Sequence, residues 1–476
     1  MLYVDFVGGV DSKIVPKHVG QALNMRFGAK MDYWKAHKTL LRARNLIRGS
    51  AESGYSDLPT YLHQIRKANP GTFTRLEVDE FDRFKYLFLA FGASIVGFSY
   101  MRKVIVVDGT FLSGKYKGTL LLATAQDGNF QIFPIAYAVV DTENDDSWEW
   151  FFQQLSNVIP DDEELAIISD RHISIGNAIG KVYPKSSRGI CTYHLYKNVL
   201  QRYGGGEAFR WVKKAANAFR MSDFIKIFDE IKGMNPALHK YLVKADVRKW
   251  ARVHFPGDRY NLTTTNIAES INKQISSSRS LPIVRLLDAI RLMMTRWFAE
   301  RRSDASSVKT TLTRGVEKML EKRVLYAKTL KVQAIDSRHA QVTGGTSLHV
   351  VNLTERKCTC RRFDIEKLPC VHALVAAEAS NKCRIALAHH YFHNNDLCKG
   401  YYTSIMPRDD ASDAPEHVAM KLCLPPIVRT PPGRPRKRRF KSALEKACDK
   451  KRPRKDYTCS RCHQSGHNCK TCKVSI

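Results

Sequence analysis

The chain has 476 residues, of which 43% are hydrophobic and 26% charged, so it is long enough for several folded units and too apolar for global disorder. Lysine and arginine number 77 against 46 aspartates and glutamates, and this net charge of +31 favours nucleic acid as partner over an anionic membrane. The longest uncharged run, Tyr86–Met101, is too short to span a bilayer, so no membrane is expected.

Residues 1–80 are predicted to form a helical N-terminal region. Apolar residues recur at helical spacing from about residue 17 until Asn69-Pro70-Gly71 ends the pattern. The first residues lack the basic segment of a secretory signal, so we expect an intracellular protein whose cysteines are reduced.

Residues 81–280 are predicted to form an α/β core with a helical insertion at about 195–258. A helix capped by Ser147 follows three strands, and strands then alternate with helices in the order βββαβαβ. This is the order of an RNase H-like fold, a mixed sheet with helices on its faces, although several other α/β folds begin similarly. The expected strands are Lys103–Val107, Thr119–Ala125, Ile132–Val140, Leu165–Ile168 and Gly189–Cys191.

Two aspartates follow strands of this core. Asp108 and Asp170 each end an apolar run, and the RNase H order places their strands side by side. Either residue alone could simply cap a turn. Together with Glu269, on a helix predicted over Thr265–Ile275, they offer oxygen ligands for a pair of Mg²⁺ or Mn²⁺ ions of the kind that phosphodiester chemistry uses.

Four ordered blocks between about residues 20 and 330 resemble Mutator-like element (MULE) transposases of the DDE type. They are Asp108-Gly-Thr-Phe-Leu-Ser-Gly-Lys-Tyr-Lys-Gly-Thr-Leu-Leu, Ser169-Asp170-Arg171, Cys191-Thr-Tyr-His194 and Asn266-Ile-Ala-Glu269-Ser-Ile-Asn272. The resemblance implies that Asp108, Asp170 and Glu269 are catalytic and cut and join double-stranded DNA at terminal inverted repeats.

The chain departs from this family in two places. After Arg171 the family tends to have Lys-Gly, whereas this chain has Ile173-Ser174. Family members usually carry an N-terminal zinc module, and nothing before Asp108 supplies its cysteines. We therefore expect a truncated DNA-binding end.

Cys191 and His194 are too few for a structural zinc site, which needs four ligands. They are either half of a composite site or buried supports for the sheet. The shortage of ligands favours support.

Residues 281–335 are predicted to form basic helices, and a zinc module over residues 340–380 follows. Its pattern C-x-C-x9-C-x-H supplies three thiolates and one imidazole, a complete tetrahedral shell, with a strand before it and a helix after it. It resembles the SWIM zinc finger, a module linked with DNA or protein binding. The predicted zinc ligands are Cys358, Cys360, Cys370 and His372.

Residues 411–457 are rich in proline, lysine and arginine and are predicted to be a disordered basic tail. Residues 431–439 resemble an AT-hook, whose core lies in an A·T-rich minor groove. The same basic runs serve equally as a nuclear import signal, which predicts a nuclear protein. The predicted DNA-contacting residues are Gly433, Arg434, Pro435 and Arg436.

Residues 458–474 have the spacing of a CCHC zinc knuckle, a module whose aromatic or apolar residues typically contact the bases of single-stranded nucleic acid. Cys469 is a spare thiol that could replace Cys472. With the SWIM finger, the knuckle predicts about two Zn²⁺ per chain. Its predicted ligands are Cys459, Cys462, His467 and Cys472.

Three functions are compatible with these features. The first is a Mutator-like DNA transposase that uses two metal ions and that could act as a homo-oligomer. The second is a domesticated, non-catalytic DNA-binding transcriptional regulator of the same descent, against which the intact carboxylates argue. The third is an RNA-directed protein that acts through the knuckle.

Overall fold

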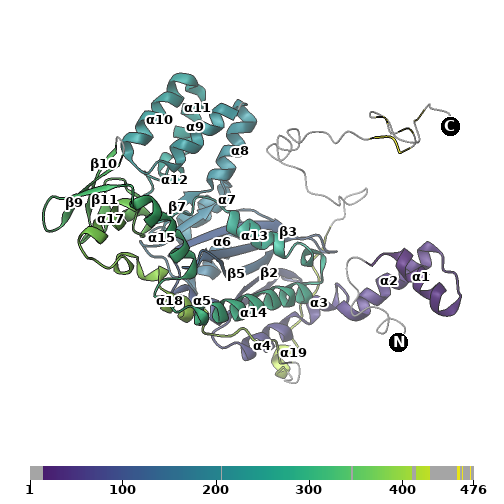
Figure 1. Ribbon diagram of the computed structural model, residues 1–476. Helices are drawn as coiled ribbons and strands as arrows, with labels where there is room; N and C mark the ends of the chain where they lie inside the picture. Colours follow the sequence, from purple (N-terminus) through teal and green to yellow (C-terminus); the bar gives the residue numbers. More distant parts are fainter. Residues whose placement is uncertain are drawn as a thin grey trace.

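The fold centres on a seven-stranded mixed sheet in the order β1-β2-β5-β4-β3-β6-β7 (Figure 1). A computed structural model describes residues 14–204, 206–344, 347–409, 414–428, 458–460, 462, 464 and 472. Strands β3, β6 and β7 are parallel to one another, and every other neighbouring pair is antiparallel. The strands are β1 (Phe73–Val78), β2 (Phe84–Ala90), β3 (Val104–Phe111), β4 (Thr119–Gln126), β5 (Ile132–Val140), β6 (Ala166–Ser169) and β7 (Ser187–Ile190).

From β3 onward the elements follow the predicted order of three strands, helix, strand, helix and strand. The sequence did not predict β1 and β2, and β1 lies in the region 1–80 that we expected to be helical. The pairing of β1 with β2, in which Phe73 opposes Ala90, explains the difference. Strand β1 is stabilised by its hydrogen bonds to β2, and its own sequence pattern does not indicate a strand. The core is therefore larger than predicted.

Helices cover both faces of the sheet. Helix α6 (Asp145–Ser156) packs against α7 (Ile173–Val182), and the rings of Tyr86 and Trp150 join β2 to α6 with centroids 5.0 Å apart. Helix α6 begins after Asn144 and not at Ser147, because the two residues form a capping box in which each side chain accepts the other's backbone N–H. The predicted N-cap was wrong by three residues.

The other face carries α13 (Asn266–Gln274) and the long helix α14 (Ile283–Ser307), which lies across the front of the sheet in Figure 1. Phe133 of β5 packs against Phe298 of α14 with ring centroids 5.5 Å apart. The helices before the sheet and between its strands are α1 (Pro16–Phe27), α2 (Tyr33–Arg48), α3 (Ser53–Ser56), α4 (Leu58–Ala68) and α5 (Gly92–Phe98).

The predicted helical insertion forms a bundle with its own core at one end of the sheet (Figure 1). Its two ends meet: the backbone N–H of Thr192 donates to the carbonyl of Thr263 at 2.8 Å, and the Thr192 hydroxyl donates to the same oxygen at 2.9 Å. Its helices are α8 (Thr192–Tyr203), α9 (Gly206–Asn217), α10 (Met221–Met234), α11 (Pro236–Lys244) and α12 (Val247–Trp250), and the short η1 (Ser278–Ser280) follows α13.

The C-terminal part adds a four-stranded antiparallel sheet in the order β11-β10-β9-β8, which packs against α17 (Val371–Ala379), and α17 in turn packs against α15 (Arg314–Ala327). Within the described ranges, no helix is long and apolar enough to cross a membrane. The remaining elements are β8 (Lys331–Ala334), β9 (His339–Gly344), β10 (Ser347–Asn352), β11 (Lys357–Cys358), α16 (Arg362–Glu366), η2 (Ile385–Leu387), η3 (His390–Phe392), α18 (Asn394–Gly400) and α19 (Glu416–Ala419). The prediction of disorder from residue 411 was wrong for residues 414–428, because Val418 and Cys423 are buried and Leu424 pairs with Arg83.

A buried charged network fastens the C-terminal part to the core. Arg102 is fully buried, lies under the ring of Phe392 and donates to the carbonyl of Asp127 at 3.2 Å. The Tyr401 hydroxyl donates to a carboxylate oxygen of Asp127 at 2.8 Å and accepts from Arg301 at 3.1 Å. Burial lowers the pKa of Arg102 to about 10 and raises that of Asp127, so each charge depends on these contacts.

Tyr401→Phe is expected to lower the free energy of unfolding by about 1–3 kcal/mol, because a buried carboxylate oxygen of Asp127 loses its hydroxyl donor. Urea denaturation followed by tryptophan fluorescence measures the change. Tyr402→Phe is the matched control, since Tyr402 is 81% exposed and should give wild-type stability. Equal stability of both variants with the wild type would contradict the role given to the network.

Candidate functional site

The sheet brings the two predicted aspartates to one edge. Strands β3 and β6 are parallel neighbours in which Val106 opposes Ile168, so Asp108 and Asp170 stand two residues further along adjacent strands. Asp108 still belongs to β3, where it pairs with Leu122, whereas Asp170 directly follows β6. Side chains alternate along a strand, and that of Asp108 faces α13.

Helix α13 delivers Glu269 to the same place. Glu269 lies in the first turn of α13, and Asn272, one turn later, donates to a carboxylate oxygen of Asp108 at 2.8 Å. Burial, reinforced by the negative charges of Glu269 and Asp170, raises the pKa of Asp108 to about 7. Three acidic side chains from β3, the end of β6 and α13 therefore share one electrostatic environment.

Cys191 and His194 connect α8 to α13 beside these carboxylates. The backbone N–H and the hydroxyl of Thr265 both donate to the Cys191 sulfur at 3.3 Å, and Thr265 is the N-cap residue of α13. The ring nitrogen Nε2 of His194 lies 3.9 Å from a carboxylate oxygen of Glu269. These contacts hold the start of α13 beside α8.

The charges of this pair are coupled. The Cys191 thiol raises the pKa of His194, and although burial opposes it, hydrogen bonding to His194 lowers the pKa of Cys191. A protonated imidazole would carry a positive charge next to Glu269. It would thereby partly balance the negative charge gathered at the site.

A fourth carboxylate, Glu143, was missed by the sequence analysis. It follows β5, is half-buried, and burial together with the charge of Asp170 raises its pKa. Its carboxylate lies over the backbone of Gly109, where an added Cβ would be only 2.5 Å from Oε1 of Glu143. Its place between a strand and a helix cap was a possible signal, hidden in the acidic run 141–146.

The donor set fits divalent cations that prefer oxygen ligands, Mg²⁺ or Mn²⁺. The site offers buried or half-buried carboxylates of like charge, and the amide oxygen Oδ1 of Asn272 is buried without a hydrogen-bond partner in the described chain. The carboxylate oxygens are not all within 4.8 Å of one another, unlike the Cys/His groups below.

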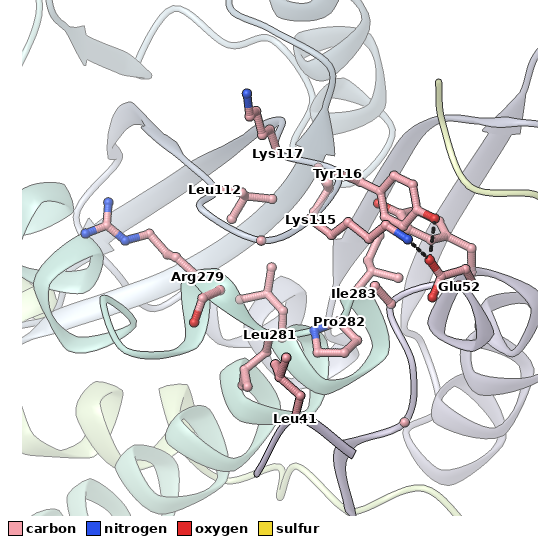
Figure 2. Close-up of a pocket in the computed structure, with 17 residues that line it drawn as sticks. Leu41, Glu52, Leu112, Lys115, Tyr116, Lys117, Arg279, Leu281, Pro282 and Ile283 are labelled. Carbon is pink, nitrogen blue, oxygen red and sulfur yellow. Dashed lines mark hydrogen bonds and ion pairs between the residues drawn. The ribbon is translucent and has the colours of Figure 1, made fainter. Parts of the chain in front are cut away.

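A cavity of about 490 Å³ adjoins the carboxylate-bearing strand (Figure 2). Lys115, Lys117 and Arg279 line it, and Arg279 also donates to the hydroxyl of Thr110, two residues after Asp108, at 2.6 Å. Its apolar lining includes Leu112, Leu281, Pro282 and Ile283. In Figure 2 the ammonium group of Lys115 pairs with Glu52, so the positive charge that this lining adds beside β3 comes from Lys117 and Arg279.

The four predicted SWIM ligands gather in one place, with their ligand atoms all within 4.8 Å of one another. Cys358 lies on β11 and His372 in the first turn of α17, with 3.6 Å between Sγ and Nδ1. The three thiols are coupled: their shared hydrogen bonds lower the pKa of Cys360 and raise that of Cys358. His349, which the sequence did not single out, packs on His372 with ring centroids 4.1 Å apart.

Three of the four predicted knuckle ligands also gather: Cys459, Cys462 and Cys472 have their sulfurs within 4.8 Å of one another. His467 lies outside the described residues, as does the spare Cys469. The AT-hook-like residues Gly433, Arg434, Pro435 and Arg436 lie outside them too.

A larger cavity, of about 860 Å³, lies where α9 and α10 of the insertion, α15 and the SWIM module converge. We call it the zinc-side groove. Three of the four SWIM ligands line it, and Phe219 in its wall lies under the guanidinium groups of Arg252 and Arg362 at 4.2 and 4.8 Å. Its basic lining residues are Lys214, Arg220, Lys322, Arg323 and Arg362.

Comparison with known proteins assigns two of these parts. Residues 104–198, which include Asp108, Asp170, Cys191 and His194, match the MULE transposase domain, and residues 341–381 match the SWIM zinc finger. Both predicted modules are thereby confirmed, and the SWIM match together with the Cys/His cluster supports zinc. Glu269 lies outside the first match.

One similar relative is the Protein FAR1-RELATED SEQUENCE 6 of Arabidopsis thaliana, 25% identical over 171 residues. The match covers 36% of this chain and 24% of the relative, about a quarter of that protein's length. These similarities support a MULE-derived protein, and its two modules point to nucleic-acid binding in general.

Proposed function

We propose that this chain is a DNA-processing protein with an RNase H-like core of the DDE type, in which Asp108, Asp170 and Glu269 hold divalent cations for strand cleavage and transfer. The observation that carries the proposal is the convergence of these carboxylates from β3, the end of β6 and α13 at one edge of the sheet. The match to the MULE transposase domain supports it.

The residues of the chain would act by holding charge in place. A bound pair of Mg²⁺ ions would activate the attacking hydroxyl and stabilise the leaving oxygen. Asn272 fixes the orientation of the Asp108 carboxylate, and His194 positions Glu269. Lys117 and Arg279 would attract the DNA backbone on the side of the cavity shown in Figure 2.

The test is strand cleavage and strand transfer by the zinc-loaded full chain on duplex DNA that ends in terminal inverted repeats, with Mg²⁺ or Mn²⁺. Metal-dependent nicks at the repeat ends are expected. Tight duplex binding without any cleavage would overturn catalysis and leave the second function below.

The second candidate is a domesticated DNA-binding transcriptional regulator, and the zinc-side groove favours it. In this groove Arg220 and Arg323 pair with Asp223 and Glu366, which leaves Lys214, Lys322 and Arg362 as basic groups that could hold nucleic acid whether or not the acidic site reacts. Both functions place the protein in the nucleus on double-stranded DNA. The sequence of the basic tail supports that location and an A·T-rich minor-groove contact.

The finer partner assignments follow from the same residues. The three gathered cysteines of the knuckle support a second zinc ion and, through it, contact with single-stranded nucleic acid. Preference for single-stranded RNA over duplex DNA in a competition assay would favour the RNA-directed alternative.

Replacing Lys214 and Lys322 together by glutamine is expected to weaken duplex binding and to lower the slope of log affinity against log salt by about 1 for each lysine that contacts a phosphate. Both residues are exposed and line the zinc-side groove. Fluorescence anisotropy across a salt series measures the change. Lys67→Gln, which changes an exposed lysine of α4, is the control, and an equal loss of affinity there would exclude a specific role for the groove.

A further inference from the structure

Glu143 occupies a position that serves no evident structural purpose. Its half-buried carboxylate is repelled by the charge of Asp170 and attracted by that of His172, and within the described part of the chain it has neither a hydrogen bond nor an ion pair. A carboxylate that loses water without gaining a donor is costly, and a second negative charge nearby raises that cost. A bound cation would offset both the cost of lost hydration and the repulsion between the two carboxylates.

The backbone around Glu143 is built to hold it there. The next residue, Asn144, caps α6 through reciprocal hydrogen bonds with Ser147 at 2.8 and 3.0 Å. The carboxylate fills the space over Gly109, where a Cβ would be 2.5 Å from Oε1 and 2.8 Å from Cδ. Any side chain at position 109 would displace it, so the glycine next to Asp108 leaves room for this carboxylate.

Asp108 and Glu143 approach the site from opposite faces of β3. Successive side chains of a strand alternate, so the Asp108 side chain points toward α13 while the space over Gly109 opens toward the start of α6. Asp170, at the end of the neighbouring strand, influences both carboxylates. Cations held by Asp170 would therefore have acidic ligands on both sides of β3.

We propose that Glu143 is a further metal-ligating residue of the carboxylate site, and that it joins Asp170 in holding one of the divalent cations. The inference rests on the function proposed above. It assigns the start of α6 to the metal site in addition to β3, the end of β6 and α13. The class of ligand is a hard divalent cation, Mg²⁺ or Mn²⁺.

The test compares Mn²⁺ binding by the zinc-loaded full chain, measured by calorimetry, in the wild type and in Glu143→Gln. The substitution keeps the shape of the side chain and removes its charge, and affinity is expected to fall roughly tenfold or more. Asp141→Asn is the matched control, because Asp141 is an exposed acid in the same connection and should bind Mn²⁺ as the wild type does.

Thermal unfolding provides a readout that a merely structural role would not move in this direction. Without divalent cations, Glu143→Gln should unfold at a higher temperature than the wild type, because repulsion with Asp170 is relieved. With Mn²⁺ the stabilisation that the metal confers should be smaller in the variant. Gly109→Ala should reproduce the loss of Mn²⁺ affinity by displacing the carboxylate.

Two outcomes would overturn the inference in distinguishable ways. If Glu143→Gln binds Mn²⁺ as the wild type does while Asp108→Asn does not, Glu143 is no ligand and the proposed function stands. If the wild type itself binds no Mn²⁺ beyond its zinc sites, the metal-dependent function fails, and the role of Glu143 fails with it.

Discussion

Asp108→Asn is expected to reduce metal-dependent DNA strand cleavage by roughly a thousandfold or more, because the central oxygen ligand of the acidic site becomes a neutral amide. Asp108 interacts with the other groups of the site: Asn272 donates to it, and the charges of Glu269 and Asp170 raise its pKa. Quantitative nicking of end-labelled duplex DNA measures the loss. Glu269→Gln should lose activity on the same scale.

The binding of duplex DNA separates chemistry from folding in this experiment. Both variants should retain wild-type affinity in the absence of divalent cations, because the zinc-side groove and the basic tail are unchanged. Glu149→Gln is the matched acidic control. Glu149 is a partly exposed residue of α6 that pairs with Lys181, and its substitution should leave cleavage intact. Robust cleavage by both Asp108→Asn and Glu269→Gln would remove the triad from consideration.

Loss of zinc from the SWIM module is expected to have the largest effect on structure. Structural zinc contributes on the order of 10 kcal/mol to the folding of small zinc modules. The ligands join β11 to α17 and contribute to the core between α17 and the four-stranded sheet. Cys360→Ser should therefore unfold this module, remove about one Zn²⁺ per chain, and open the zinc-side groove.

Metal analysis and limited proteolysis report these changes separately. The wild type should contain about two Zn²⁺ per chain, and fewer than one would refute at least one of the clusters. Proteolysis of Cys360→Ser should cleave within residues 331–379, while the MULE domain stays intact. Cys383→Ser is the control, because Cys383 is an exposed thiol outside both clusters. A protected module in Cys360→Ser would show that zinc is dispensable there.

The sequence predicted those parts of the protein whose chemistry is local. The SWIM ligands lie within 15 residues, so their spacing alone defines a coordination shell. Strands β3 to β6 were predicted because each is a short apolar run bounded by turn residues, whereas β7 (Ser187–Ile190) begins two residues before the predicted strand Gly189–Cys191. Strands β1 and β2 were not, since β1 is only partly buried and depends on pairing with β2.

Glu143 and the zinc-side groove show what sequence patterns cannot reveal. Glu143 stands in the acidic run 141–146, which has the composition of a solvated connection, and only its contact with Gly109 distinguishes it. The groove combines α9, α10, α15 and the SWIM module, which are distant in the chain. Tertiary contacts, rather than local patterns, create both features.

The meeting of Thr192 with Thr263 has a consequence for how such proteins can diverge. The chain leaves the core and returns to it at almost the same point. The size of the intervening bundle therefore does not change the distance between the two points where it joins the sheet. The cost of closing a loop grows only slowly with its length. Descendants could therefore enlarge, shrink or exchange the bundle, and acquire a different nucleic-acid surface, while the carboxylates of the core keep their positions.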